Sequence, residues 1–172
     1  AVLYRSNAQS RVFEELLLDA GIPYRVYGGL RFFERAEIKD ALAYLRLAYS
    51  HDSDTAFERI VNTPTRGVGA RTLEAVRMTG RVEGLSLWKA TVQLVQSDTL
   101  PKRARFALQN FLELINALVN QLTDLKLSEQ VSVIISHSGL IDHYRKERGE
   151  RAETRVENLE ELVNAARHFS FD

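Results

Sequence analysis

The stretch PKRARFALQNFLELINALVNQL, residues 101–122, carries the clearest structural signal in this chain. Its apolar residues recur every three or four positions, at Ala104, Leu108, Phe111, Ile115, Leu118 and Leu122. This spacing places them on one face of an α-helix. The stretch therefore predicts a long helix that begins near Pro101 and packs against a core rather than forming a binding site.

Helical periodicity with recognisable capping residues continues through most of residues 28–172. One expected helix has an apolar face that includes Ile38, Leu42 and Leu45. Other helices are expected to start at the capping residues Asp54, Ser86, Ser128 and Thr154, and after the glycines of residues 67–69. Because there is no repeat of fixed period, the pattern predicts a mainly α fold with an all-helical domain, not a solenoid.

Residues 1–27 have a different pattern. AVLY, residues 1–4, is typical of a buried strand, and YRVY, residues 24–27, alternates as a second strand would. Between them, Ser6 and Gln9 form a capping-box pattern at the start of an amphipathic helix. A strand, helix, strand unit of this kind needs a larger sheet around it. Since residue 1 is not Met and the last residues are exposed aromatics, we expect a piece of a longer protein.

Composition narrows the classes of function. The 23 basic and 23 acidic residues cancel, so attraction to nucleic acid must come from local patches. The absence of cysteine excludes disulfides, thiolate metal sites and a cysteine nucleophile, and it fits a cytosolic protein. No apolar run approaches the length that a bilayer requires, so we expect a soluble protein that does not bind membranes.

The stretch TPTRGVGART, residues 63–72, is the strongest candidate for a binding site. A Gly-x-Gly turn that leads into a helix leaves unpaired backbone N–H groups, which favour an anion. Arg66 and Arg71 flank this turn, and a phosphate of nucleic acid is the ligand that such a site fits. A solvent-exposed loop with a glycine at the helix start is an equally acceptable interpretation of the turn alone.

Catalytic patterns are missing from the sequence. Neither glycine pair is followed by the lysine of a phosphate-binding ATPase loop, so we expect no ATP hydrolysis by this chain alone. The four histidines are scattered, and no nucleophile elbow is present, so neither a metal site nor acyl transfer is expected. Negative charge near a helix start explains the acidic group better than a metal site does; it comprises Glu153, Glu157, Glu160 and Glu161.

Arg31 and Arg35 surround the pair Phe32 and Phe33, an arrangement that a single-stranded nucleic-acid track would use for stacking and charge neutralisation. Packing of the aromatic rings beside solvated arginines is the more common alternative. Basic runs near residues 102–105 and 145–151 are interpreted as plain surface.

Three stretches together carry a family resemblance: AVLYRSNAQSR (residues 1–11), GGLRFFERAEIKD (28–40) and TPTRGVG (63–69). In order and spacing they resemble motifs of the UvrD/Rep/PcrA family of superfamily 1 DNA helicases. RVENLEEL, residues 155–162, is similar to the R-x-E-N-L-E-E-L segment of the same family, so the likeness spans nearly the whole chain. It is weakest between about residues 80 and 150.

The resemblance implies that residues 1–27 are a β-α-β piece of a RecA-like motor subdomain and that residues 28–172 are a helical accessory (2B) subdomain. It implies a parent protein that uses ATP and Mg²⁺ to move 3'-to-5' along DNA in excision and mismatch repair, in the bacterial cytoplasm near the nucleoid. This chain would hold DNA contacts without catalytic, metal or cofactor-binding residues. A regulatory module that docks repair proteins or inhibits the motor is the alternative.

The resemblance also implies individual contacts. Arg5, Asn7 and Lys39 match positions that touch single-stranded DNA in the family. The loop that grips the duplex backbone corresponds to Thr65, Arg66, Gly67, Val68, Gly69, Arg71 and Thr72. Val68 stands where the family often has Ile, a change that keeps a small apolar side chain.

Overall fold

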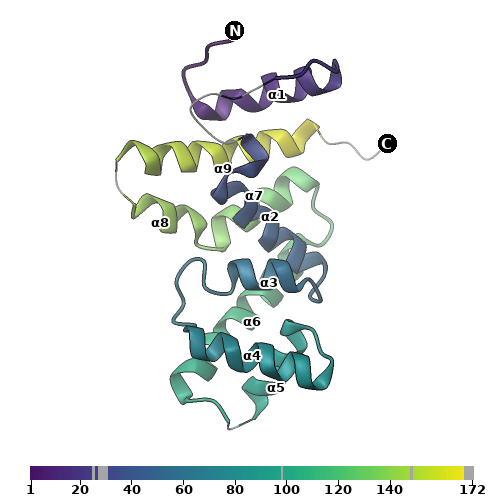
Figure 1. The fold of residues 1–172 in the computed structure, drawn as a ribbon, viewed down its shortest axis with the longest axis vertical. Helices are drawn as coiled ribbons and strands as arrows, with labels where there is room; N and C mark the ends of the chain where they lie inside the picture. The colour runs from purple at the N-terminus through teal and green to yellow at the C-terminus, as the bar shows by residue number, and fades with distance from the viewer. Residues whose placement is uncertain (25, 27–30, 98, 148, 169–172) are drawn as a thin grey trace.

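The computed structural model describes residues 1–24, 26, 31–97, 99–147 and 149–168, and all regular secondary structure in these ranges is helical (Figure 1). Two short 3₁₀ helices, η1 (Asn7–Gln9) and η2 (Phe32–Glu34), precede longer elements. The α-helices are α1 (Ser10–Asp19), α2 (Ala36–Tyr49), α3 (Asp54–Ile60), α4 (Ala70–Glu83), α5 (Leu87–Gln96), α6 (Lys102–Leu122), α7 (Leu127–His137), α8 (Leu140–Arg145) and α9 (Glu150–His168). The mainly α prediction is confirmed.

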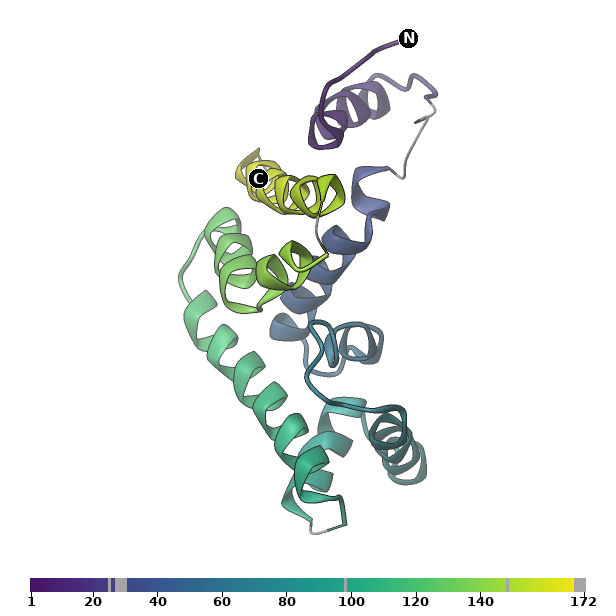
Figure 2. The ribbon, with the colours of Figure 1, turned by 90° about the vertical axis from the view of Figure 1, so that its left-hand side faces the viewer.

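The helices are stacked along the long axis of the molecule (Figures 1 and 2). Helix α1 lies at one end beside α9, and α4 and α5 lie at the other end. Between them, α2 packs against α3, α6, α7 and α9, so it connects most of the layers. No helix in the described ranges is long and apolar enough to cross a membrane.

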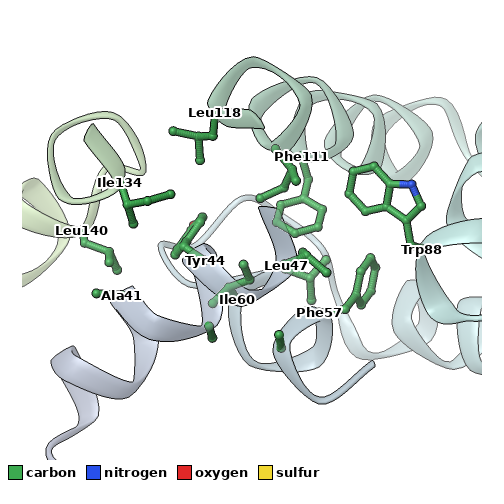
Figure 3. Close-up of a cluster of buried hydrophobic side chains, with 14 of the residues drawn as sticks. Ala41, Tyr44, Leu47, Phe57, Ile60, Trp88, Phe111, Leu118, Ile134 and Leu140 are labelled. Atoms are coloured by element: carbon green, nitrogen blue, oxygen red, sulfur yellow. The ribbon is translucent and has the colours of Figure 1, made fainter. Parts of the chain in front are cut away.

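Helix α6 contributes the core face that its sequence predicts. Leu108, Phe111, Ile115 and Leu118 are fully buried. Figure 3 shows aromatic and aliphatic side chains of α2, α3, α5 and α6 meeting in one cluster. The ring of Phe111 packs edge-on against Phe57 of α3, with centroids 5.5 Å apart. Burial of this apolar surface is the main contribution to the stability of the helical body, by which we mean the helices α2 to α9.

The predicted helix starts are partly right. Ser86 is the N-cap of α5, and its hydroxyl accepts a hydrogen bond from the N–H of Lys89 at 3.4 Å. Helix α7 begins at Leu127, one residue before the predicted Ser128. Local capping chemistry therefore identifies the start of α5, whereas Ser128 lies inside α7, whose N-cap is Lys126.

Two predicted caps are wrong. Asp54 is the first residue of α3, and its carboxylate accepts a hydrogen bond from the N–H of Leu87 at 2.8 Å, which joins α3 to α5. Thr154 lies inside α9, where its hydroxyl donates to the carbonyl of Glu150 at 2.9 Å. In both cases a nearby partner outside the predicted cap competes for the side chain.

The β-α-β prediction for residues 1–27 is wrong in its strands. Residues 1–4, 24 and 26 belong to no strand, and none occurs in the described part of the chain; residues 25 and 27 lie outside that part. A parallel pair needs neighbouring strands and cover on both faces, which the described residues do not supply. The helix itself is confirmed, because Gln9 Oε1 accepts hydrogen bonds from the N–H groups of Arg5 (3.0 Å) and Ser6 (3.1 Å) ahead of α1.

Residues 6–14 meet α9 and η2 through polar side chains, a contact that we call the polar junction. Arg11 Nε lies 2.7 Å from Glu161 Oε1, and the Ser6 hydroxyl donates to Glu157 Oε2 at 2.7 Å. These contacts correct the helix-start explanation of Glu157 and Glu161, since α9 begins at Glu150 and both residues lie well inside it.

Candidate nucleic-acid interface

The chain turns sharply between α3 and α4. Gly67 has a φ of 82°, in the left-handed region that other residues adopt only with strain. Val68 points inward and is 3% exposed, whereas Gly67 and Gly69 are exposed. The turn is therefore anchored by one apolar side chain and presents its two glycines to solvent.

Asn62 fixes the backbone of this turn. Its Oδ1 accepts hydrogen bonds from the N–H groups of Arg66 at 2.8 Å and Val68 at 3.3 Å. An Asn side chain that bonds backbone groups a few residues later is a common turn device. Asn62 is not among the predicted site residues, although an Asn directly before Thr63 and Pro64 is a sequence signal for a turn.

The guanidinium of Arg66 turns back toward the body instead of outward. Nη1 donates to the carbonyls of Ile60 (2.9 Å) and Pro64 (3.1 Å). Nη2 donates to the hydroxyl of Tyr44 and to the carbonyl of Ser138 at 3.1 Å. Its central carbon also lies 5.6 Å from the ring centroids of Tyr44 and Phe111, two of the buried rings that Figure 3 labels.

Tyr44 holds this arrangement from α2. Its hydroxyl donates to the carbonyl of Thr63 at 2.7 Å while it accepts from Arg66. Burial raises the pKa of Tyr44 to about 12, although Arg66 opposes the shift. The hydroxyl therefore keeps its proton at neutral pH and remains a donor to the turn.

Helix α4 begins without a side-chain cap, since its N-cap is Gly69. The N–H groups of Ala70, Arg71 and Thr72 have no acceptor among the described residues. The Arg71 side chain is exposed and has no ion-pair partner in the described ranges, while Thr72 is half-buried and Thr65 is exposed. Several donors and one cation thus face solvent at the positive end of a helix.

Gly69 is not required by the packing of the chain. Its φ of −81° suits any residue, and an added Cβ would meet no atom within 4 Å. Ser, Thr, Asn or Asp at this position would cap α4 better than glycine does. Open space and free donors at the same point suit the close approach of an external anion.

The residues predicted to contact single-stranded DNA lie elsewhere. Arg5 precedes η1, Asn7 is its first residue, and Lys39 lies on α2; the side chains of Arg5 and Lys39 are exposed. Because η1 contacts α1 and α9 while α4 packs against α5, the two predicted sets occupy different layers of the stack (Figure 1).

The arginine and phenylalanine cluster at residues 31–35 is mostly a packing feature. Phe32 is fully buried and Arg35 is 8% exposed, with the guanidinium 5.3 Å from the Phe32 ring centroid. Burial lowers the pKa of Arg35, and Glu14 and Glu37 offset part of that effect. Arg31 and Phe33 present exposed side chains. The packing interpretation is therefore right for Phe32, but Arg35 is buried and not solvated as that interpretation expected.

In the described ranges, no group of His, Cys, Asp and Glu side chains is arranged to hold a metal ion. Of the four acidic residues, Glu157 and Glu161 contact the polar junction, and His51 lies flat against Trp88 with ring centroids 4.1 Å apart. The turn before α4, with an uncapped helix start and the exposed Arg71, is the candidate site that the described surface offers.

Known proteins are similar to this chain over nearly its whole length. The family model for the UvrD-like helicase C-terminal domain matches residues 1–171. The chain is 58% identical over 172 residues to DNA helicase II of Escherichia coli (strain K12), covering 100% of the chain and 24% of that protein. It is 54% identical over 169 residues to DNA helicase II of Haemophilus influenzae, covering 98% of the chain and 23% of that protein.

ATP-dependent DNA helicase PcrA of Bacillus subtilis is 41% identical over 169 residues, with 98% of the chain and 23% of that protein covered. The chain therefore spans about a quarter of the length of the curated relatives that it matches. Since the family match extends over nearly every residue, the chain belongs to the UvrD-like helicase C-terminal domain family.

Proposed function

We propose that this chain is the DNA-binding accessory part of an ATP-dependent DNA helicase that moves 3'-to-5' in excision and mismatch repair. It contacts the duplex backbone through the turn at residues 63–72. The observation that carries the proposal is the uncapped start of α4, where free N–H groups and Arg71 meet open space in front of Gly69. The names of the relatives, DNA helicase II and ATP-dependent DNA helicase PcrA, support the class of activity.

In this proposal residues 1–27 belong to a RecA-like motor subdomain and residues 28–172 form the accessory subdomain. ATP and Mg²⁺ bind to other parts of the parent protein, which acts in the bacterial cytoplasm, and this chain alone has neither ATPase nor helicase activity. Arg5, Asn7 and Lys39 contact the single strand. Backbone N–H groups recognise phosphates and not base edges, so the duplex contact is independent of sequence.

Gly69→Asp tests the site most directly. A carboxylate at the N-cap satisfies the free donors of α4, which stabilises the helix by about 1 kcal/mol and places negative charge where the phosphate binds. We expect a higher melting temperature together with weaker binding of a duplex with a single-stranded tail. Gly69→Asn separates the effects, because it supplies a neutral cap, raises stability and weakens binding less.

Arg71→Ala gives an independent measurement. Loss of one phosphate contact lowers the slope of log K against log salt by roughly 0.9. Arg81→Ala is the matched control, because Arg81 is exposed near the other end of α4. Unchanged duplex binding in both Gly69→Asp and Arg71→Ala contradicts the proposed contact. Absence of DNA binding at low salt, with a repair protein retained, supports the alternative of a regulatory module.

A further inference from the structure

We infer, on the basis of the proposed duplex contact, that Arg66 does not bind phosphate but is a positioning residue. Together with Asn62 and Tyr44, it holds the turn at residues 66–69 so that its free N–H groups face the DNA backbone. The inference reassigns Arg66 and gives a role in DNA binding to two side chains that touch no DNA.

Few N–H donors of the Arg66 guanidinium remain available to bind a phosphate. A guanidinium carries five N–H donors, of which each terminal nitrogen supplies two. Both terminal nitrogens of Arg66 are fully used, by the carbonyls of Ile60 and Pro64 on one side and by Tyr44 and the Ser138 carbonyl on the other. The two terminal nitrogens through which arginine forms a bidentate contact with phosphate therefore already donate to groups within the protein.

The acceptors of Arg66 lie in separate parts of the chain. Ile60 ends α3, Pro64 belongs to the turn, Tyr44 lies on α2, and Ser138 follows α7. One planar group therefore fixes the turn relative to three packed elements. A lysine ammonium carries the same charge but has three donors on a flexible stem, so it does not reproduce this pattern.

Asn62 completes the arrangement from within the turn. By accepting from the N–H groups of Arg66 and Val68, it directs these two donors toward the protein. The intervening Gly67 N–H and the Gly69 N–H have no acceptor among the described residues. The donors are thereby sorted into an inner pair that shapes the turn and an outer set that is free for a ligand.

The experiment records amide chemical shifts of the 172-residue chain by ¹H–¹⁵N NMR while a short DNA duplex with a single-stranded tail is added. The expected result for the unaltered chain is a shift at the amides of Gly67, Gly69 and Arg71. Arg66→Lys keeps the charge but removes the planar guanidinium with its several N–H donors. We expect these amide shifts to disappear and duplex affinity to fall roughly tenfold. Arg81→Lys is the matched control, because Arg81 is exposed near the other end of α4, away from the turn, and duplex affinity should remain within about threefold.

Tyr44→Phe keeps the ring and removes only the hydroxyl that orients Arg66, so it remains informative if Arg66→Lys does not fold. We expect the same loss of shifts at Gly67 and Gly69, with the spectrum of the remaining helices unchanged. Binding of single-stranded DNA alone is the second readout. It should be the same in both variants as in the unaltered chain, whereas a general loss of folding would weaken it.

The outcomes separate the two proposals. If the unaltered chain shows no duplex-dependent shift at Gly67 or Gly69, the duplex contact itself is wrong and the positioning role fails with it. If the unaltered chain shows the shifts and both Arg66→Lys and Tyr44→Phe retain them with full affinity, the duplex contact stands and the positioning role is overturned.

Discussion

The helical body and the polar junction bury opposite kinds of side chain. In the body, Phe57 and Ile115 are fully buried against other apolar groups. In the polar junction, Arg11 is 5% exposed, whereas Leu16 and Leu18 of the same helix are 61% and 71% exposed. Helix α1 is therefore packed by its polar face, and its apolar face is uncovered by the described residues.

This difference shows that amphipathicity identifies a helix without saying which face is buried. Charged groups tolerate burial when each has a partner, and Arg11 has both Glu161 and Glu15 within 2.7 Å. The uncovered apolar side also borders a hollow of about 580 Å³ lined by residues of the first strand-like stretch and α1. The following changes test the contrast between the two regions.

Phe57→Ala should have the largest effect, because it removes a fully buried ring from the body. We expect a loss of about 3–5 kcal/mol in the free energy of unfolding, measured by urea denaturation. Phe106→Ala is the matched control, since Phe106 is 64% exposed and its loss should change stability by less than about 0.5 kcal/mol. Equal effects of the two changes would show that the body is not held by its apolar core.

Arg11→Ala should act on the polar junction alone. The change removes hydrogen bonds to Glu161 and Glu15 and costs about 2 kcal/mol in the local opening of α1. Hydrogen exchange should become faster at α1 amides and remain unchanged in α6. A uniform loss of protection in α1 and α6 would mean that the junction and the body unfold together.

Protonation of His51 should make the stability of the body depend on pH, with a smaller effect than the Phe57 and Arg11 substitutions have. Among the described residues, its Nε2 is the buried side-chain polar atom without a hydrogen-bond partner. Burial lowers the pKa of His51 below its usual 6.5, although Asp52 opposes the shift. The unfolded chain therefore binds the proton more readily, so stability is complete above about pH 6.5 and declines as the pH falls below that value.

The measurement compares urea denaturation at about pH 7.5 and about pH 5 in the unaltered chain and in His51→Gln. We expect the variant to lose less stability on acidification than the unaltered chain does. Trp88 fluorescence reports the same event, because the imidazole stacks on the indole. Identical pH dependence in both proteins would exclude His51 as the titrating group.

Leu16→Glu combined with Leu18→Lys should have the smallest effect on stability. Both side chains are exposed, so we expect a change within about 0.5 kcal/mol by thermal denaturation. A clear loss of stability would show that the apolar face of α1 is covered in solution.

The sequence predicts the elements that depend on neighbouring residues. The stripe of α6, the cap at Ser86 and the glycine turn at residues 67–69 are all encoded within a turn or two of chain. Two glycines and the helix that follows them indicate the candidate site in the same way. Such features need no knowledge of distant partners.

The tertiary structure alone decided how individual side chains are used. Arg66 has the same sequence signal as Arg71, yet it turns inward because its acceptors include Ser138, 72 residues away. Arg11 is buried because Glu161, 150 residues away, forms an ion pair with it. Periodicity and capping depend on residues that are close together in the chain and can therefore be predicted from the sequence. The side of a helix that is buried, and the acceptor that a guanidinium finds, depend on which distant segments meet in the folded chain.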